Sequence, residues 1–304
     1  MIYLKNKEHS RQYHLMLLPA VILLFVFKVL PLTGLYMAFL DYNLFAPLFG
    51  LGSPFVGLKN FRTIFLDHPD SFQVIVNTLV LAVAKIIANI IVPVTFALLL
   101  NECLNQKIKR TIQTVVYLPH FLSWVIAALM FRQIFGLRGI VNSVLMNLNL
   151  VEEPFMFFAS NAWFRPLVVF TDVWKGFGYG AIVFIAAITA IDLNLYEAAD
   201  IDGSNRWQKM RYITLPGILP TVILMSTLAL GNILNAGFDQ VFNMYNPSVY
   251  QTGDILDTFV YRIGLINLKF HLATAVGMAK SVISFILIMI SYKLAHKFAG
   301  YRIF

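Results

Sequence analysis

The sequence predicts an all-α polytopic membrane protein with six transmembrane helices. Hydrophobic residues make up 59% of the 304 residues and charged residues only 12%, about half the charged share of a soluble globular domain. Apolar runs of about 20 residues recur along the chain, and each is long enough to cross a hydrocarbon core of about 30 Å. The predicted spans cover residues 14–40, 72–100, 111–135, 166–191, 217–238 and 272–294.

The first predicted span follows basic residues and could be mistaken for a secretory signal. Its apolar run is longer than a signal needs, and Lys28 and Pro31 stand where a small-residue cleavage site is required. We therefore expect a retained membrane anchor. Because no soluble domain or internal repeat is visible, residues 1–304 are predicted to form a single transmembrane domain, with its larger loops at 41–71, 136–165 and 239–271.

The placement of lysine and arginine predicts which loops face the cytoplasm. The two tails, residues 101–110 and residues 192–216 carry three basic residues each, whereas the longer alternate loops carry two each. Under the positive-inside rule, both termini and the 192–216 loop are cytoplasmic. This distribution accounts for the net charge of +8 without a nucleic-acid partner.

The sequence carries little that could perform catalysis or bind a metal. Cys103 is the single cysteine, no histidine pair has metal-ligand spacing, and the HExxH, GxSxG and GxxxxGK[ST] motifs are absent. We therefore predict a non-catalytic chain without a metal site or a cofactor of its own.

The polar loop at 192–216 is typical of a docking element. Residues 197–199 favour a helix that Gly203 would break. Asn205 can cap a second short helix, which Leu215-Pro216 would end. Two short helices around a glycine would form a knob that could insert into a cleft of another protein. The alternative is an interfacial helix with its tryptophan at the lipid headgroups.

The spacing of this loop resembles a known signature. Glu197-Ala198-Ala199, Gly203, Ile213 and Leu215-Pro216 match the EAA signature of ABC importer permeases at every defined position. Other stretches resemble the sugar-permease branch and permeases of the LplB type, which carry polysaccharides and oligosaccharides. These stretches are Gly57-Leu58-Lys59-Asn60-Phe61, Tyr117-Leu118-Pro119, Leu18-Pro19-Ala20 and Pro31-Leu32-Thr33-Gly34.

The resemblance implies a type I ABC importer permease fold in a bacterial cytoplasmic (inner) membrane. It implies a second homologous permease (a heterodimer), two cytoplasmic ATPases that bind ATP and Mg, an extracytoplasmic solute-binding protein and a saccharide substrate. The 192–216 loop would form a coupling helix seated in a groove of one ATPase, with Glu197 facing a basic residue and Gly203 at the elbow. The coupling residues expected in this way are Glu197, Ala198, Ala199, Asp202, Gly203, Trp207, Met210, Ile213, Leu215 and Pro216.

Polar and aromatic residues inside the apolar spans are candidates for the substrate path. Ionisable residues in a span usually face a cavity or a partner, and aromatic rings can stack on sugars. Bonding and packing between helices are the competing explanations. The candidates are Lys85, Asn89, Trp174, Lys175, Tyr179, Asn232, Asn235 and Asp239.

Two of these groups predict particular surfaces. Asn232, Asn235 and Asp239 are spaced i, i+3, i+7, which predicts a polar stripe on the fifth span, suited to sugar hydroxyl groups. Several lysines facing one cavity would favour an acidic saccharide, such as an alginate- or pectin-like uronide.

Two other functions remain open from the sequence. The loop signature is shared by ABC permeases for amino acids, peptides or phosphate, which substrate-dependent stimulation of the partner ATPase would distinguish. A secondary transporter or channel would instead work from the purified chain alone, driven by an ion gradient, and would leave the loop signature unexplained.

Overall fold

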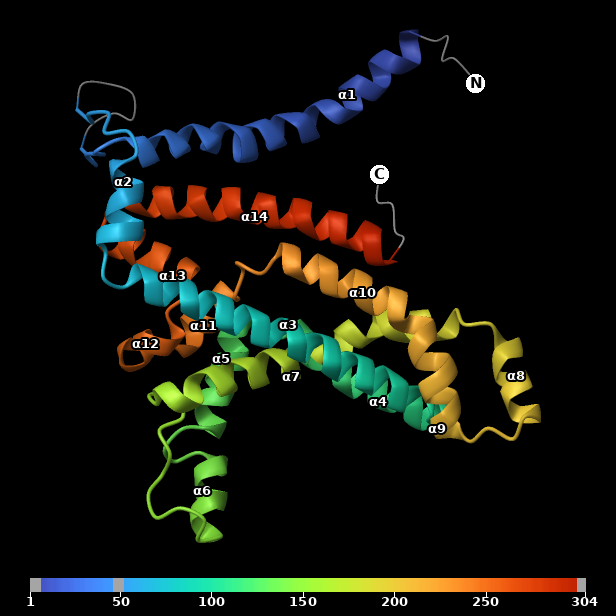
Figure 1. Ribbon diagram of the computed structural model, residues 1–304. Coiled ribbons are helices and arrows are strands. Elements are labelled where there is room, and N and C mark those ends of the chain that lie inside the picture. Colours follow the sequence, from blue (N-terminus) through green and yellow to red (C-terminus); the bar gives the residue numbers. More distant parts are fainter. Residues whose placement is uncertain (1–6, 46–51, 300–304) are drawn as a thin grey trace. The chain divides into compact units, whose positions relative to one another are not determined.

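The computed structural model describes residues 7–45 and 52–299 (Figure 1). Within these ranges the regular elements are helices, and an isolated bridge joins Leu40 to Phe55. The all-α prediction is confirmed. The predicted cytoplasmic placement of the chain ends rests partly on Lys5 and Arg302, which lie outside the described residues.

Five helices in the described residues are long and apolar enough to cross a membrane, and a sixth span results if one bent pair counts as one. Four of the five helices agree with predicted spans to within about five residues. The five are Gln12–Phe39, Ser71–Asn101, Asn161–Thr189, Arg206–Gly231 and Phe270–Leu294, and the bent pair is Gln106–Phe121 with Trp124–Ile134.

The chain divides into two compact units, Met1–His68 with Val260–Ala279, and Pro69–Phe259 with Lys280–Phe304. In the first unit, α1 (Lys7–Leu24) continues through a π-helical turn and a 3-10 helix to Phe39. The Asn60 side chain, on α2 (Lys59–Arg62), donates to the carbonyl oxygens of Ala38 and Leu40 at 3.0 and 2.7 Å. Asn60 therefore holds the chain that leaves the first span.

The second unit is built on α3 (Ser71–Asn101) and α7 (Asn161–Thr189), which pack along each other. α10 (Leu215–Gly231) contacts both helices. The remaining helices are α4 (Gln106–Tyr117), α5 (Trp124–Ile134), α6 (Ile140–Asn147), α8 (Leu193–Ile201), α9 (Arg206–Lys209), α11 (Phe238–Met244), α12 (Tyr250–Gly253), α13 (Leu256–Tyr261) and α14 (Phe270–Ala299).

The third predicted span, 111–135, is wrong as one straight helix. α4 passes into a 3-10 turn at Leu118–Phe121, and the chain then bends by 104° before α5. Pro119 lies in this turn and cannot donate a backbone N–H, while the Ser123 hydroxyl accepts from the Ile126 N–H and caps a new helix. A proline followed by a capping serine therefore breaks an apolar run that looks continuous.

The predicted start of the fifth span is also wrong, because Leu215-Pro216 does not end the preceding helix. α9 runs through a π-helical turn, Met210–Thr214, directly into α10, so that the span begins at Arg206. Pro216 is the second residue of α10, so the helix continues past a residue that donates no backbone N–H.

The predicted end of the fifth span is wrong as well. α10 stops at Gly231, Asn232 is its C-cap residue, and the next helix, α11, begins at Phe238 after Gly237 adopts a left-handed φ of +91°. Asn232, Asn235 and Asp239 therefore do not form a stripe on one helix face. Glycine at both ends of a short asparagine-containing segment favours a break over a continuous helix.

α7 comes very close to α4 at Gly178. A Cβ atom at Gly178 would lie 2.3 Å from the Val116 carbonyl oxygen, whereas one at Gly180 would lie 3.5 Å from Pro93 Cγ, an ordinary contact distance. Gly178→Ala is expected to lower the free energy of unfolding by about 1–3 kcal/mol, the usual cost of overpacking. Thermal unfolding in detergent would measure the loss, with Gly180→Ala as the tolerated control. Equal melting temperatures of the two variants would contradict the prediction.

Candidate functional site

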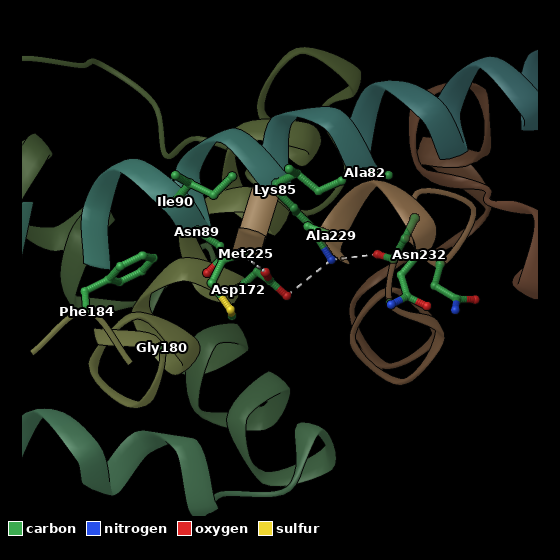
Figure 2. Close-up of a pocket in the computed structure, with 14 residues that line it drawn as sticks. Ala82, Lys85, Asn89, Ile90, Asp172, Gly180, Phe184, Met225, Ala229 and Asn232 are labelled. Carbon is green, nitrogen blue, oxygen red and sulfur yellow. Dashed lines mark hydrogen bonds and ion pairs between the residues drawn. The ribbon is translucent and has the colours of Figure 1, made fainter. Parts of the chain in front are cut away.

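A cavity of about 320 Å³ lies between α3, α7, α10 and the segment after α10 (Figure 2). Apolar side chains such as Phe184 and Met225 line part of it. Its polar groups come from three elements: α3 contributes a lysine and an asparagine, α7 an aspartate, and the break after α10 two asparagines. These residues are Lys85, Asn89, Asp172, Asn232 and Asn235.

Lys85 has its polar partners within the chain. Its side chain is 9% exposed, and its ammonium donates to the Ala236 carbonyl oxygen at 2.7 Å and to Gln240 Oε1. Asp172 Oδ1 lies 3.4 Å from the ammonium, and Figure 2 shows Lys85 reaching between Asp172 and the segment after α10. A charge inside a span needs such partners because lipid supplies none.

The partners of Lys85 are themselves held in place. Asn89 Nδ2 donates to Asp172 Oδ2 at 2.8 Å. Gln240 Nε2 donates to the Val168 carbonyl oxygen at 2.7 Å and to Thr171 Oγ1 at 2.8 Å. One hydrogen-bonded network thus joins α3, α7 and the start of α11 across one side of the cavity.

A second lysine holds the same break from α14. Lys280 Nζ donates to Asn235 Oδ1 at 2.7 Å and to Asp257 Oδ1 at 2.5 Å. Both of these acceptors lie within this chain. Asn235 both lines the cavity and accepts from Lys280.

The structure brings half of the path candidates to the cavity. Lys85, Asn89, Asn232 and Asn235 line it, whereas Asp239, on α11, does not appear in its lining. Among the described residues that line the cavity, Lys85 is the one lysine, and it faces Asp172. The expected lining with several lysines is therefore not what these residues form.

The other candidates, all on α7, lie against the bend between α4 and α5. Lys175 Nζ donates to the His120 carbonyl oxygen at 2.8 Å and lies 5.3 Å from the centre of the Trp124 ring. Tyr179 stacks on the His120 ring, with centroids 4.0 Å apart, and Trp174 meets Phe131 edge-on. Lys175 therefore stabilises the bend, as Lys85 stabilises the break after α10.

The 192–216 loop folds into two helical segments around a glycine. Gly203, with a φ of +72°, follows α8. The Gly203 N–H donates to the Asp200 carbonyl oxygen and the Ser204 N–H to the Ala199 carbonyl oxygen, the two bonds of a Schellman motif. Asn205 then caps α9 in a capping box with Gln208.

Three contacts join the two limbs of this loop, which lie side by side in Figure 1. At the base, a Cβ at Gly217 would lie 2.7 Å from Ile191 Cδ1. In the middle, the Tyr196 hydroxyl and Thr214 Oγ1 are 2.8 Å apart, and near the tip Lys209 pairs with Asp200. Because these three contacts hold the two limbs together, we call the 192–216 loop the braced hairpin.

The predicted coupling residues differ in exposure. Glu197, Ala198, Asp202, Gly203, Leu215 and Pro216 are exposed, as is Trp207 at 66%, while Ala199, Met210 and Ile213 are partly buried. Ile201, at 88% exposure, adds a second large apolar side chain beside Gly203. The end of the hairpin thus presents exposed acidic residues, Glu197 and Asp202 among them, and exposed apolar groups.

Sequence reasoning missed Gln240, Gly237, Tyr196 and Thr214. Gln240 and Thr214 are polar residues next to apolar runs, but such residues usually bond within the bundle without a special role. Gly237 carried the clearest signal, because a glycine after two asparagines is typical of a turn. The long apolar run before Gly237 favoured a continuous helix instead, so the turn was not predicted.

Residues 89–299 match the family described as "Binding-protein-dependent transport system inner membrane component". The chain belongs to this family. It is therefore an inner-membrane permease of a binding-protein-dependent transport system, as the loop signature implied.

Relatives of this permease match over nearly its whole length. Protein LplB of Bacillus subtilis is 39% identical, over 96% of this chain and 90% of LplB. The polygalacturonan/rhamnogalacturonan transport system permease protein YteP of the same organism is 38% identical, over 95% of this chain and 89% of YteP.

Solved structures support the same fold. A chain in the crystal structure of a bacterial ABC transporter involved in the import of the acidic polysaccharide alginate has a TM-score of 0.86 and 32% identity, over 96% of this permease and 97% of that chain. A chain of the bacterial alginate transporter in complex with alginate pentasaccharide-bound periplasmic protein has a TM-score of 0.87 and 32% identity, over 97% and 98%. The permease therefore has the fold of an ABC importer permease.

Proposed function

We propose that this permease imports oligo- or polysaccharides, including acidic ones, as the transmembrane subunit of an ATP-driven ABC importer. The observation that carries the proposal is its full-length likeness, at 32% identity, to the alginate importer chains. The polygalacturonan permease relative also handles an acidic polymer. Asn89, Asn232 and Asn235 supply amide groups to the cavity, and amides can both donate to and accept from sugar hydroxyls.

The partners follow from the proposal. A second homologous permease completes the path as a heterodimer, and a solute-binding protein delivers the saccharide from outside. Two cytoplasmic ATPases supply ATP and Mg chemistry, because this chain has no phosphate-binding loop motif. Both termini and the 192–216 loop lie in the cytoplasm, in keeping with the distribution of basic residues.

The braced hairpin docks in a groove of one ATPase. Its exposed Glu197 meets a basic residue there, and Trp207 and Ile201 fill apolar positions. When ATP closes the ATPase pair, the hairpin moves with the groove. Because α7 precedes the hairpin and α10 continues from it, the movement reaches two helices that line the cavity, and access changes from one side of the membrane to the other.

The test is the ATPase activity of the reconstituted importer with its binding protein, across oligosaccharides of matched length. Uronate oligomers, such as alginate or polygalacturonate fragments, are expected to stimulate hydrolysis more than neutral oligomers. Equal stimulation would remove the acidic preference. Stimulation by amino acids, peptides or phosphate but no saccharide would assign another solute class, and ion-driven uptake by the chain alone would overturn the ABC mechanism.

A further inference from the structure

The helix of the fifth span ends at Gly231, short of its predicted end at residue 238. α10 ends at Gly231 and α11 starts at Phe238, and Asn232 and Asn235 lie in the break and line the cavity. Within a membrane, backbone outside a helix persists where protein groups satisfy it or where it lines a cavity. The break therefore needs partners from neighbouring helices.

Lys85 supplies such a partner from α3. Its ammonium donates to the carbonyl oxygen of Ala236 and to the side chain of Gln240, one on each side of Gly237. Asp172 on α7 balances its charge at 3.4 Å. The Lys85 ammonium can join these three places because it offers three donors on a long, flexible stem.

Gly237 leaves the space that this arrangement requires. A Cβ atom at Gly237 would lie 2.9 Å from Lys85 Nζ, closer than a Cβ normally approaches another heavy atom. The left-handed φ of +91° also suits glycine best. The backbone of the break is thus shaped around the ammonium group.

We propose that Lys85 is a positioning residue for transport: it fastens the break after α10 to α3 and α7, so that the amides of Asn232 and Asn235 face the cavity. The proposal rests on the proposed function and deepens it. Because Asp172 neutralises Lys85, the lysine acts through the shape of the cavity wall and exerts little net attraction on an anionic sugar.

Two substitutions separate this role from a general loss of stability. Lys85→Met removes the cation but leaves the partly buried Asp172 carboxylate without this partner, which by itself costs stability. Combining Lys85→Met with Asp172→Asn removes both charges, and Asn at 172 keeps a group that can bond to Asn89. Lys293→Met, at an exposed lysine of α14, is the matched control.

The measurement is saccharide uptake by proteoliposomes that contain the complete importer, with binding protein loaded with neutral or uronate oligomers of matched length. The double variant is expected to raise the apparent KM by about tenfold for both sugars, the effect of losing a hydrogen bond to a charged group. The kcat is expected to change by less than about twofold, because neither substitution touches the braced hairpin. Lys293→Met is expected to match the wild type.

Three results would overturn the proposal. An unchanged KM in the inserted double variant would show that Lys85 does not position the amides. An increase for the uronate alone would assign Lys85 to charge recognition. A fall of kcat by the same factor for both sugars, with KM unchanged, would mean that the network serves the conformational change. Failure of the wild-type importer to take up any saccharide would instead refute the proposed function, so the two failures are distinguishable.

Discussion

Gly203→Val is expected to separate ATP hydrolysis from transport, because the valine disfavours the turn that closes the braced hairpin, which we propose docks on the ATPase. The φ of Gly203 is +72°, and a Cβ there would meet no atom within 4 Å, so the substitution tests the backbone conformation alone. The left-handed conformation costs an ordinary L residue about 1–2 kcal/mol, which reduces the population of the turn roughly 5- to 30-fold. The ratio of sugar transported to ATP hydrolysed in proteoliposomes would report the loss.

Gly203→Asn is the matched control, because asparagine tolerates the left-handed region. We expect it to keep most of the coupling. Glu197→Ala gives an independent comparison: its side chain is exposed, so it is expected to lower the same ratio through docking without lowering the melting temperature. A wild-type ratio in Gly203→Val would contradict a role for the turn.

Gly237→Ala is expected to have the second large effect, a loss of most transport together with a lower melting temperature. Alanine incurs the left-handed backbone cost, about 1–2 kcal/mol, and its Cβ would lie 2.9 Å from Lys85 Nζ. The ammonium must then shift, which weakens its bonds to Ala236 and Gln240 and loosens the break. Uptake and thermal unfolding of the same preparation would measure both losses.

Combining Gly237→Ala with Lys85→Ala separates the backbone cost from the cost of the clash with the Lys85 ammonium. In a Lys85→Ala background the clash is absent, so Gly237→Ala is expected to cost less there than in the wild type, and the difference is the coupling between the two sites. Gly277→Ala is the control on a helix, because a Cβ there would meet no atom within 4 Å outside its own helix backbone. Identical costs in both backgrounds would show that Lys85 and Gly237 act independently.

The features that sequence predicted well are local. Asn205 caps a helix and Gly203 ends one because each acts on residues within about five positions. The same holds for the apolar runs that form α3 and α7, where composition alone sets the length. The braced hairpin and most of the spans could therefore be predicted from the sequence alone.

The features that sequence did not predict depend on distant residues. Pro119 in an apolar run is compatible with a kinked helix as well as a break, and the carbonyl oxygen of His120 at the bend bonds to Lys175 of α7. The break after α10 likewise depends on Lys85 and Lys280 from other helices. Lysines that looked like path residues are largely the means by which interrupted helices satisfy their backbone and polar side chains.

The Lys85 network also has a consequence for how the protein is made. Lys85 bonds to Ala236, 151 residues later in the chain, so the ribosome delivers the lysine to the membrane long before its acceptor exists. A lone lysine at the centre of a span costs about 3 kcal/mol on insertion scales. The second span therefore carries this cost when it first enters the bilayer, and the cost is offset once the fourth and fifth spans bring Asp172 and Ala236.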